Sequence, residues 1–335
     1  MPPRRPSLLL LLLALVMGCA PRAALDPSSL RVGFFPNVTH MVPLSAMARG
    51  SFAQALAPAT IEWKGFSSGP QAIEALFAGA IDVCYVGPGP ATNGYLRSEG
   101  DALVVLAGAA EGGAGLVMRK GVDIHSPADL RGKKLAAPQL GNTQDVALRG
   151  YLEANGLLTV DRGGDVTVIP MGNPGILTLL RRGDLDGAWV PEPWLTRIVK
   201  ELDGKIFLDE KTLWPGERFP TTVLVAAKAS LAVKRPLIGK LIAAHVEEVA
   251  WLRAHPAEGE ANVAASIKKI AGKGLPKDVM HTAYAHVTPT WDALPDAIRH
   301  QALAARKLHY LPDGDLGGMI DLSLLDGALA ARGAP

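Results

Sequence analysis

Apolar and polar positions change period along the chain, and the changes predict strands and helices in alternation. Residues 30–35, 60–64 and 134–137 are each expected to form a strand. Between the first two, residues 42–56 repeat their apolar positions with a helical period. After Pro70, which suits a first helical turn, the apolar residues 73, 76 and 77 share one helix face. Strands that alternate with helices predict an α/β protein.

The same pattern continues over most of the chain. We expect further strands at 103–107, 166–170, 205–208 and 221–227, a short helix at 127–132, and longer helices at about 143–155, 173–182 and 238–252. Residues 108–115 are small and predict a passage between elements. Beyond residue 257 the pattern predicts only helices and loops.

One motif occurs twice. Residues 76–88 align with residues 180–192, and each copy shows a helix that ends at a glycine, an aliphatic-Asp pair, and an apolar strand that leads to proline. Two copies predict two similar lobes. Ligands of open α/β sheets bind beyond the carboxyl ends of the strands, so the loops 87–90 and 189–193 are expected to face each other across a cleft.

The N-terminal residues predict export and a lipid anchor. Arg4 and Arg5 precede the apolar run 8–17, which is too short to cross a bilayer of about 30 Å and is typical of a signal peptide. The run ends in Leu15-Val16-Met17-Gly18-Cys19, which resembles the lipobox of bacterial lipoproteins. We therefore expect a signal peptide at 1–18, lipidation of Cys19, and a tether over 19–29 that holds the protein at a membrane surface.

Composition narrows the classes of function. Removal of Arg4 and Arg5 lowers the 34 Lys and Arg residues to 32, which equals the 32 Asp and Glu residues, so the mature chain is formally neutral and we expect no nucleic-acid partner. Cys84 lies in an apolar strand and is expected to be a buried thiol. The scattered histidines show no metal-ligand spacing and the chain has no phosphate-binding loop motif, so we expect no metal and no cofactor.

Length and the returning strand at 221–227 predict how the lobes divide. About 300 residues after the tether exceed what one core usually serves. We expect one lobe over 30–113 and 222–330 and a second lobe over 114–221. Two crossings, near 112–115 and 219–224, would then form a double-strand hinge.

A set of ordered motifs resembles a known family. These motifs are Arg31-Val32-Gly33-Phe34-Phe35-Pro36, residues 75–82 followed by Gly87-Pro88, Asp129-Leu130-Arg131-Gly132-Lys133-Lys134, Gly141-Asn142-Thr143, and Trp189-Val190-Pro191-Glu192-Pro193-Trp194. Together they resemble the periplasmic solute-binding proteins of nitrate, aliphatic-sulfonate and taurine ABC importers over residues 30–255. The resemblance implies a two-lobed type II periplasmic-binding-protein fold, a ligand between the lobes, and delivery to a membrane permease with a separate ATPase.

The candidate ligand-binding residues lie in loops at the ends of predicted strands, where helix starts offer free amides to an oxyanion. They are Asn37, Thr39, His40, Ser67, Ser68, Gly69, Gly87, Pro88, Gly113, Gly141, Asn142, Thr143, Asn173, Trp189 and Glu192. Several of the polar ones are equally good helix caps. The loops that carry the expected donors hold no Lys or Arg, which predicts an anion held by amides and hydroxyls alone.

Two acidic residues leave the ligand class open. Glu111 and Glu192 would repel an anion if they faced it, so they either point away or accept from an amine on a zwitterion such as taurine. We expect a monomeric, membrane-anchored binding protein on the periplasmic or outer face of the membrane. The alternatives are an enzyme of the pyrimidine-synthase or menaquinone-pathway type, which share this fold, and a ligand-sensing partner of a receptor.

Overall fold

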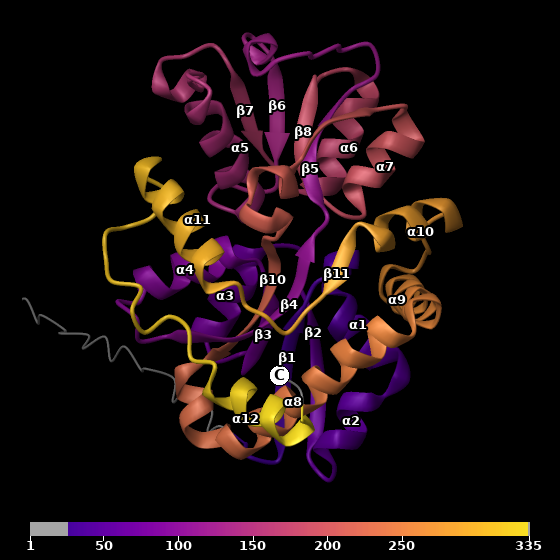
Figure 1. Cartoon of the computed structure of the whole chain (residues 1–335), viewed down its shortest axis with the longest axis vertical. Helices are drawn as coiled ribbons and strands as arrows, with labels where there is room; N and C mark the ends of the chain where they lie inside the picture. Colours follow the sequence, from indigo (N-terminus) through magenta and orange to yellow (C-terminus); the bar gives the residue numbers. More distant parts are fainter. Residues whose placement is uncertain (1–25, 334–335) are drawn as a thin grey trace, which may run out of the picture.

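The computed structural model describes residues 26–333, and these form two α/β lobes, each built on its own sheet (Figure 1). This confirms the expected two-lobed fold. The signal peptide, Cys19 and most of the tether lie outside the described residues. Among the residues that the structure describes, no helix has the length and apolar character needed to cross a bilayer.

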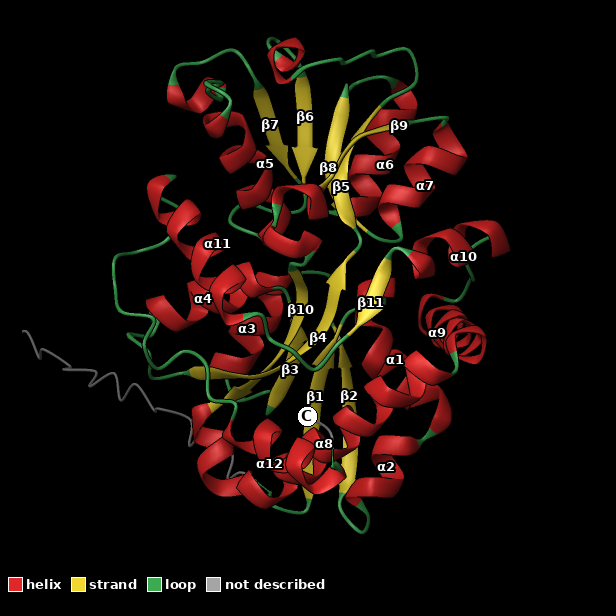
Figure 2. Cartoon of the chain, viewed as in Figure 1, coloured by secondary structure: helices red, strands yellow, loops and turns green. Residues whose placement is uncertain are grey.

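The first lobe contains a mixed six-stranded sheet (Figure 2). Its strands are β1 (Ser29–Phe34), β2 (Thr60–Gly65), β3 (Val83–Val86), β4 (Leu103–Gly112), β10 (Pro220–Ala227) and β11 (Val287–Pro289). They lie in the order β11-β4-β10-β3-β1-β2, with β1 parallel to β2 and β3, and β10 antiparallel to β3 and β4. The carboxyl ends of β1, β2 and β3 therefore meet at one edge of the sheet.

Helices cover both faces of this sheet. They are α1 (Met41–Arg49), α2 (Ser51–Leu56), α3 (Gly69–Phe77), α4 (Pro88–Arg97), α8 (Lys228–Ala254), α9 (Pro256–Ala271), α10 (Lys277–Ala285), α11 (Pro295–Lys307) and α12 (Ser323–Arg332), with a 3-10 turn at Val38–His40. Apolar residues of α1, α2, α8 and α9 form one core with the sheet, and those of α3 and α4 form another. Burial of these apolar faces is what holds the helices on the sheet.

The second lobe repeats this plan around a five-stranded sheet. Its strands are β5 (Ala114–Met118), β6 (Lys134–Ala137), β7 (Thr167–Pro170), β8 (Gly187–Pro191) and β9 (Lys205–Asp209), in the order β7-β6-β8-β5-β9. Its helices are α5 (Thr143–Ala154), α6 (Asn173–Arg182) and α7 (Trp194–Leu202), with 3-10 turns at Pro127–Leu130, Val160–Arg162, Glu210–Leu213 and Pro215–Glu217. Helix α5 packs on one side of the sheet, and α6 and α7 pack on the other.

Two chain segments connect the lobes, as expected for a double-strand hinge. The first runs from β4 to β5 through Gly112 and Gly113, whose φ angles of 78° and 68° lie in the left-handed region that glycine tolerates best. At Gly113 a Cβ would also lie 2.5 Å from the Val287 side chain. The second segment runs from residues 215–217 into β10 at Pro220.

Three expectations from the pattern were wrong in detail. The helix expected at 42–56 is two helices, because Gly50 has a φ of 71° and interrupts it. Residues 108–112 are not a loop but continue β4, because their small side chains let β10 and β11 pair alongside. The helical and loop region after residue 257 contains the short strand β11, which pairs with β4 at the edge of the sheet.

The repeated motif forms matching units in separate lobes, α3 with β3 and α6 with β8. In the first unit the amide of Asp82 donates to Arg31 O, and the Asp82 carboxylate accepts from Arg31 N at 2.8 Å. In the second unit Asp186 makes the same two bonds with Lys134, and its carboxylate distance is 2.9 Å. Each aspartate thus joins its strand to the neighbouring parallel strand.

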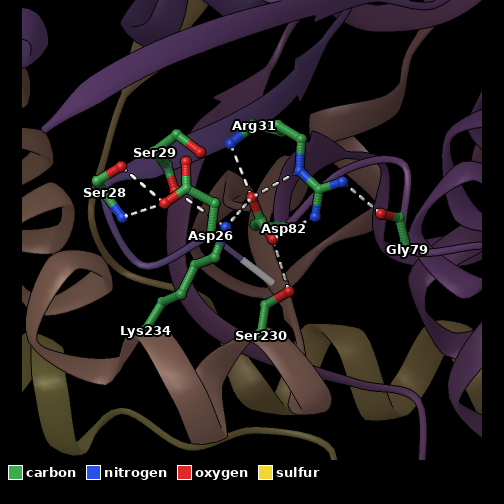
Figure 3. A network of polar contacts seen from close by, with 8 residues as sticks. All are labelled: Asp26, Ser28, Ser29, Arg31, Gly79, Asp82, Ser230 and Lys234. Atoms are coloured by element: carbon green, nitrogen blue, oxygen red, sulfur yellow. Dashed lines mark hydrogen bonds and ion pairs between the residues drawn. The ribbon is translucent and has the colours of Figure 1, made fainter. Parts of the chain in front are cut away.

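Asp82 is also the centre of a buried polar network (Figure 3). Its carboxylate accepts from the Arg31 guanidinium at 2.7 and 3.0 Å, from Lys234 Nζ at 2.9 Å and from Ser230 Oγ at 2.8 Å. Burial by itself would raise the pKa of Asp82, but these donors outweigh it and lower the pKa to about 2. The network lies at the amino end of β3, away from the edge where the carboxyl ends of β1, β2 and β3 meet, so we assign it to stability.

Candidate functional site

A narrow cavity lies between the lobes, and its empty volume together with the open space at its mouth is about 520 Å³. Both sheets direct loops into it from the carboxyl ends of their parallel strands. The residues that line it are Phe35, Asn37, Thr39, His40, Ser67, Ser68, Gly87, Pro138, Gln139, Asn142, Thr143, Gln144, Gly172, Asn173, Pro191 and Thr221. Nine of these belong to the predicted ligand-binding set, so the structure brings most of that set together.

Four helices begin at this cavity, two from each lobe. The capping residues Ser68 of α3, Gly87 of α4, Asn142 of α5 and Gly172 of α6 all line it. The first amides of a helix have no partner within the helix, and the aligned peptide dipoles place a partial positive charge there. Four such ends around one cavity favour a negatively charged group.

None of the described residues that line the cavity is Lys, Arg, Asp or Glu. A bound anion would therefore be held by neutral donors and helix ends, and no charged side chain would have to be desolvated each time the ligand binds. The absence of a lining carboxylate also means that no like charge repels an anion at this position.

His40 supplies a neutral donor from the first lobe. Burial lowers the pKa of its imidazole to about 3, so the ring is uncharged at physiological pH. Its Nδ1 lies 3.3 Å from the Phe35 amide and accepts that hydrogen bond. The single proton of the neutral ring is thereby placed on Nε2, which is left to donate to a ligand.

Two buried polar atoms at the cavity lack a partner among the described residues. These are Ser68 Oγ on the first lobe and Asn173 Oδ1 on the second. A buried polar atom without a hydrogen bond costs about 1–3 kcal/mol, so such atoms are normally paired in the functional state. They lie on opposite walls of the cavity, one in each lobe.

The amide cradle expected at residues 141–143 is wrong in detail. The amide of Gly141 donates to Asp145 Oδ2 at 2.9 Å, and the amide of Thr143 donates to Asn142 Oδ1 at 2.9 Å. Asn142 thus acts as the helix cap, the alternative role already open to it. The donors that α5 offers are instead the Asn142 Nδ2 group and the amide of Gln144, whose place in the first turn leaves it without a helical acceptor.

The two lobes touch around the cavity. Gly89 N in α4 donates to Thr143 Oγ1 in α5 at 3.2 Å, and Trp194 Nε1 in α7 donates to Asn37 Oδ1 at 3.3 Å. A Cβ on Gly87 would lie 2.6 Å from Thr143 Oγ1. The structure therefore shows the lobes closed on each other.

Six predicted residues do not line this cavity. Trp189 is fully buried in the second lobe, where it packs near Tyr151 and donates to Glu210 Oε2 at 2.7 Å, so its expected place in the cleft is wrong. The remaining five serve the frame of the site: Gly69 packs on Pro90, Pro88 starts α4, Gly141 precedes the α5 cap, Gly113 lies in the hinge, and Glu192 is buried beside it.

The two acidic residues are occupied elsewhere. Glu192 accepts from Thr196 N and Oγ1 and lies 2.6 Å from His286 Nδ1. Glu111 pairs with Arg218 at 2.8 Å. Both therefore point away from the cavity, which was the first of the two possibilities left open by the sequence.

Sequence reasoning missed seven lining residues, which are Phe35, Pro138, Gln139, Gln144, Gly172, Pro191 and Thr221. A partial signal was present, because Gln139 follows β6, Gly172 follows β7 and Pro191 ends β8. Loops at the carboxyl ends of parallel strands are the usual location of a ligand. Thr221 gave no such signal, because it lies at the start of β10, just after the second hinge segment, and not in a loop that follows a parallel strand.

Comparison with known proteins gives a consistent result. The model of the NMT1-like family matches residues 23–268. The taurine-binding periplasmic protein of Escherichia coli (strain K12) is 28% identical over 200 residues, which cover 59% of this chain and 58% of that protein. The match therefore spans less than two thirds of the relative's length.

Two solved structures share the fold. The alkanesulfonate-binding protein of Xanthomonas axonopodis pv. citri, bound to MOPS, has a TM-score of 0.70 at 20% identity and covers 91% of this chain and 99% of its own. The periplasmic nitrate-binding protein of Synechocystis PCC 6803 has a TM-score of 0.77 at 16% identity, and the match covers 92% of this chain and 90% of that protein. These names match the family that the ordered motifs resemble, and that prediction is confirmed.

Proposed function

The chain belongs to the NMT1-like family, and from this we propose that it is the substrate-binding component of an ABC importer. It captures a small organic oxyanion between its lobes and delivers it to a membrane permease that works with a separate ATPase. The observation that carries the proposal is the convergence of four helix N-termini on a cavity whose described lining is uncharged.

Within this class we favour a sulfonate that has no amine. Glu192 and Glu111 are bound to other groups, and no carboxylate is among the described lining residues. An ammonium group of a taurine-like zwitterion would have to be bound by neutral acceptors such as Asn173 Oδ1, which compensate its lost hydration less well than a carboxylate does. The three oxygens of a sulfonate suit donors that come from several directions.

We propose binding rather than catalysis, because the described groups of the cavity are suited to donating hydrogen bonds to an anion. The pKa of His40 is lowered to about 3, so its ring is a poor general base at neutral pH and serves as a hydrogen-bond donor. The protein is proposed to work as a monomer on the periplasmic side, held to the membrane by acyl chains on Cys19.

Isothermal titration of the purified protein with methanesulfonate, taurine and nitrate tests the proposed function. We expect saturable binding of at least one of the two organic sulfonates, with methanesulfonate tighter than taurine, and unchanged ligand recovered afterwards. Absence of binding by every organic sulfonate tried would contradict the proposal, and so would chemical conversion of the ligand.

A further inference from the structure

A second, wider cavity opens directly from the first. It has an empty volume of about 1550 Å³ and shares with the first cavity the residues Phe35, Asn37, Ser67, Gln139, Gly172 and Asn173. We call it the vestibule. Its remaining lining comes from α7 in the second lobe and from the end of α9 and the loop before α10 in the first. A ligand bound in the inner cavity therefore has a continuous path into the vestibule.

Aromatic rings from both lobes line the vestibule. Phe35 and Phe66 follow the first two strands of the first lobe, and Trp194 begins α7 of the second lobe. All three side chains are half-buried, so each presents part of a ring to the space between the lobes. Half-covered aromatic surface on facing walls is typical of a site that takes a flat apolar group.

Neighbouring contacts hold two of these rings in place. Trp194 is fixed by its hydrogen bond to Asn37 and by the Arg197 guanidinium, which lies 4.8 Å from its ring centroid. Phe35 packs on His40 with a centroid distance of 4.5 Å. Asn37 and His40, which contact these rings, also line the inner cavity. We call the neutral donors of that inner cavity the anion cradle.

Three of the described residues that line the vestibule are charged, namely Arg197, Glu201 and Lys273. Arg197 Nε pairs with Glu201 Oε1 at 2.6 Å, so the two compensate each other. Lys273 is exposed. The residues that the vestibule shares with the inner cavity are uncharged, so an apolar group beside them would not have to remove water from a charge.

We propose that the ligand is an aryl sulfonate: its sulfonate occupies the neutral cradle and its aromatic ring lies between Phe66 and Trp194. This proposal rests on the proposed function and adds the chemical class of the group that the sulfonate carries. A nitrate or a methanesulfonate would fill only the cradle and leave the three rings in contact with water. An aromatic ring buries that surface and gains offset or edge contacts with rings from both lobes, which also draws the lobes together.

Titration calorimetry with benzenesulfonate and methanesulfonate tests the proposal, because the two share the head group and differ in the tail. We expect benzenesulfonate to bind about tenfold more tightly or better, the gain typical of burying one aromatic face. In Phe66→Leu, which keeps an apolar side chain but loses the flat ring, this advantage falls several-fold while the affinity for methanesulfonate stays within about twofold. In Trp194→Phe, which keeps a ring and loses the bond to Asn37, most of the advantage remains.

Three outcomes overturn the inference. Equal affinity for the two sulfonates overturns the aryl tail and leaves the proposed function standing. The aryl tail is also overturned if Phe66→Leu weakens the binding of both sulfonates equally, because Phe66 would then affect only the shape of the sulfonate site. The proposed function would still stand. If neither sulfonate binds the wild-type protein, the proposed function and the tail assignment fail together.

Discussion

Glu192 Oε1 lies 2.6 Å from His286 Nδ1, although the two residues belong to different lobes. Glu192 follows β8 in the second lobe, and His286 precedes β11 in the first. The side chain of Glu192 also lies beside Gly113, in the first hinge segment. The pair therefore joins the lobes at the hinge in the closed structure.

The first prediction concerns the pH dependence of this contact. The hydrogen bond that His286 Nδ1 donates to the Glu192 carboxylate raises the pKa of His286 above its ordinary value of 6.5. A raised pKa means that the pair stabilises the closed protein fully below about pH 6.5 and that the contribution is lost as the pH rises through the higher, folded-state pKa. The His286 side chain is 40% exposed, so we expect at most about 1 kcal/mol.

Urea unfolding of wild type and His286→Gln at about pH 5.5 and pH 8.5 measures the effect. The difference in free energy of unfolding is expected to be larger at the lower pH. His281→Gln is the control, because His281 also pairs with a glutamate but is 77% exposed on α10 and does not join the lobes. A difference that is independent of pH, or larger at pH 8.5, would contradict the assignment.

The second prediction concerns the unpartnered atoms of the cradle. Ser68→Ala removes a buried hydroxyl that a ligand would satisfy, so the ligand affinity should fall about five- to tenfold, equivalent to about 1–1.4 kcal/mol. Asn173→Ala should have a similar effect, because it removes the amide Nδ2 group that can donate to a sulfonate oxygen. Asn155→Ala, at the exposed far end of α5, is the matched control and should leave affinity unchanged. Titration calorimetry decides, and silent variants at both Ser68 and Asn173 would refute the bridging site.

The third prediction tests closure. A Cβ on Gly87 would lie 2.6 Å from Thr143 Oγ1, and one on Gly89 would lie 3.0 Å from the Thr143 backbone, so Gly87→Ala/Gly89→Ala should hold the lobes apart. We expect about a tenfold loss of affinity or more. Small-angle scattering should give a larger radius of gyration than wild type at saturating ligand. Gly150→Ala meets nothing within 4 Å and is the control; if it behaves like the double variant, contact between α4 and α5 does not limit closure.

The fourth prediction uses the two equivalent aspartates. Asp82→Asn leaves the buried ammonium of Lys234 without a full countercharge and should destabilise the protein by about 3–5 kcal/mol. Asp186→Asn affects a pair whose side chains are 25–31% exposed and should cost about 1 kcal/mol or less. Thermal unfolding compares them. Equal losses would show that the strand-joining bonds, which both variants alter, matter more than the buried charge.

The fifth prediction concerns the proposed anchor at Cys19. Acyl chains contribute about 0.8 kcal/mol for each buried CH₂ group, so Cys19→Ser should move the protein out of the membrane fraction. Cys84→Ser is the control, because Cys84 is buried in β3 and should not affect fractionation. If the wild-type N-terminus carries no lipid mass, the anchor proposal is wrong.

The sequence by itself determined most of the elements and their division between two lobes. Apolar period, helix caps and the repeated Gly-Asp motif are local signals, and the copies at 76–88 and 180–192 predicted the matching units that the structure shows. The cavity-facing loops at Asn37, Ser68, Asn142 and Asn173 were predicted for the same reason, because each begins a helix after a strand. Buried Cys84 was also predicted correctly from its strand.

Tertiary structure alone decided where individual side chains point and which donors remain free. The Trp189 side chain lies in the core rather than the cleft, because Glu210, 21 residues later, is buried beside it and accepts a hydrogen bond from its indole N–H. The amides at 141 and 143 are used by Asp145 and Asn142, whereas Ser68 Oγ and Asn173 Oδ1 have no partner among the described residues. Such outcomes depend on competition among all neighbouring donors and acceptors, and those neighbours come from distant parts of the chain.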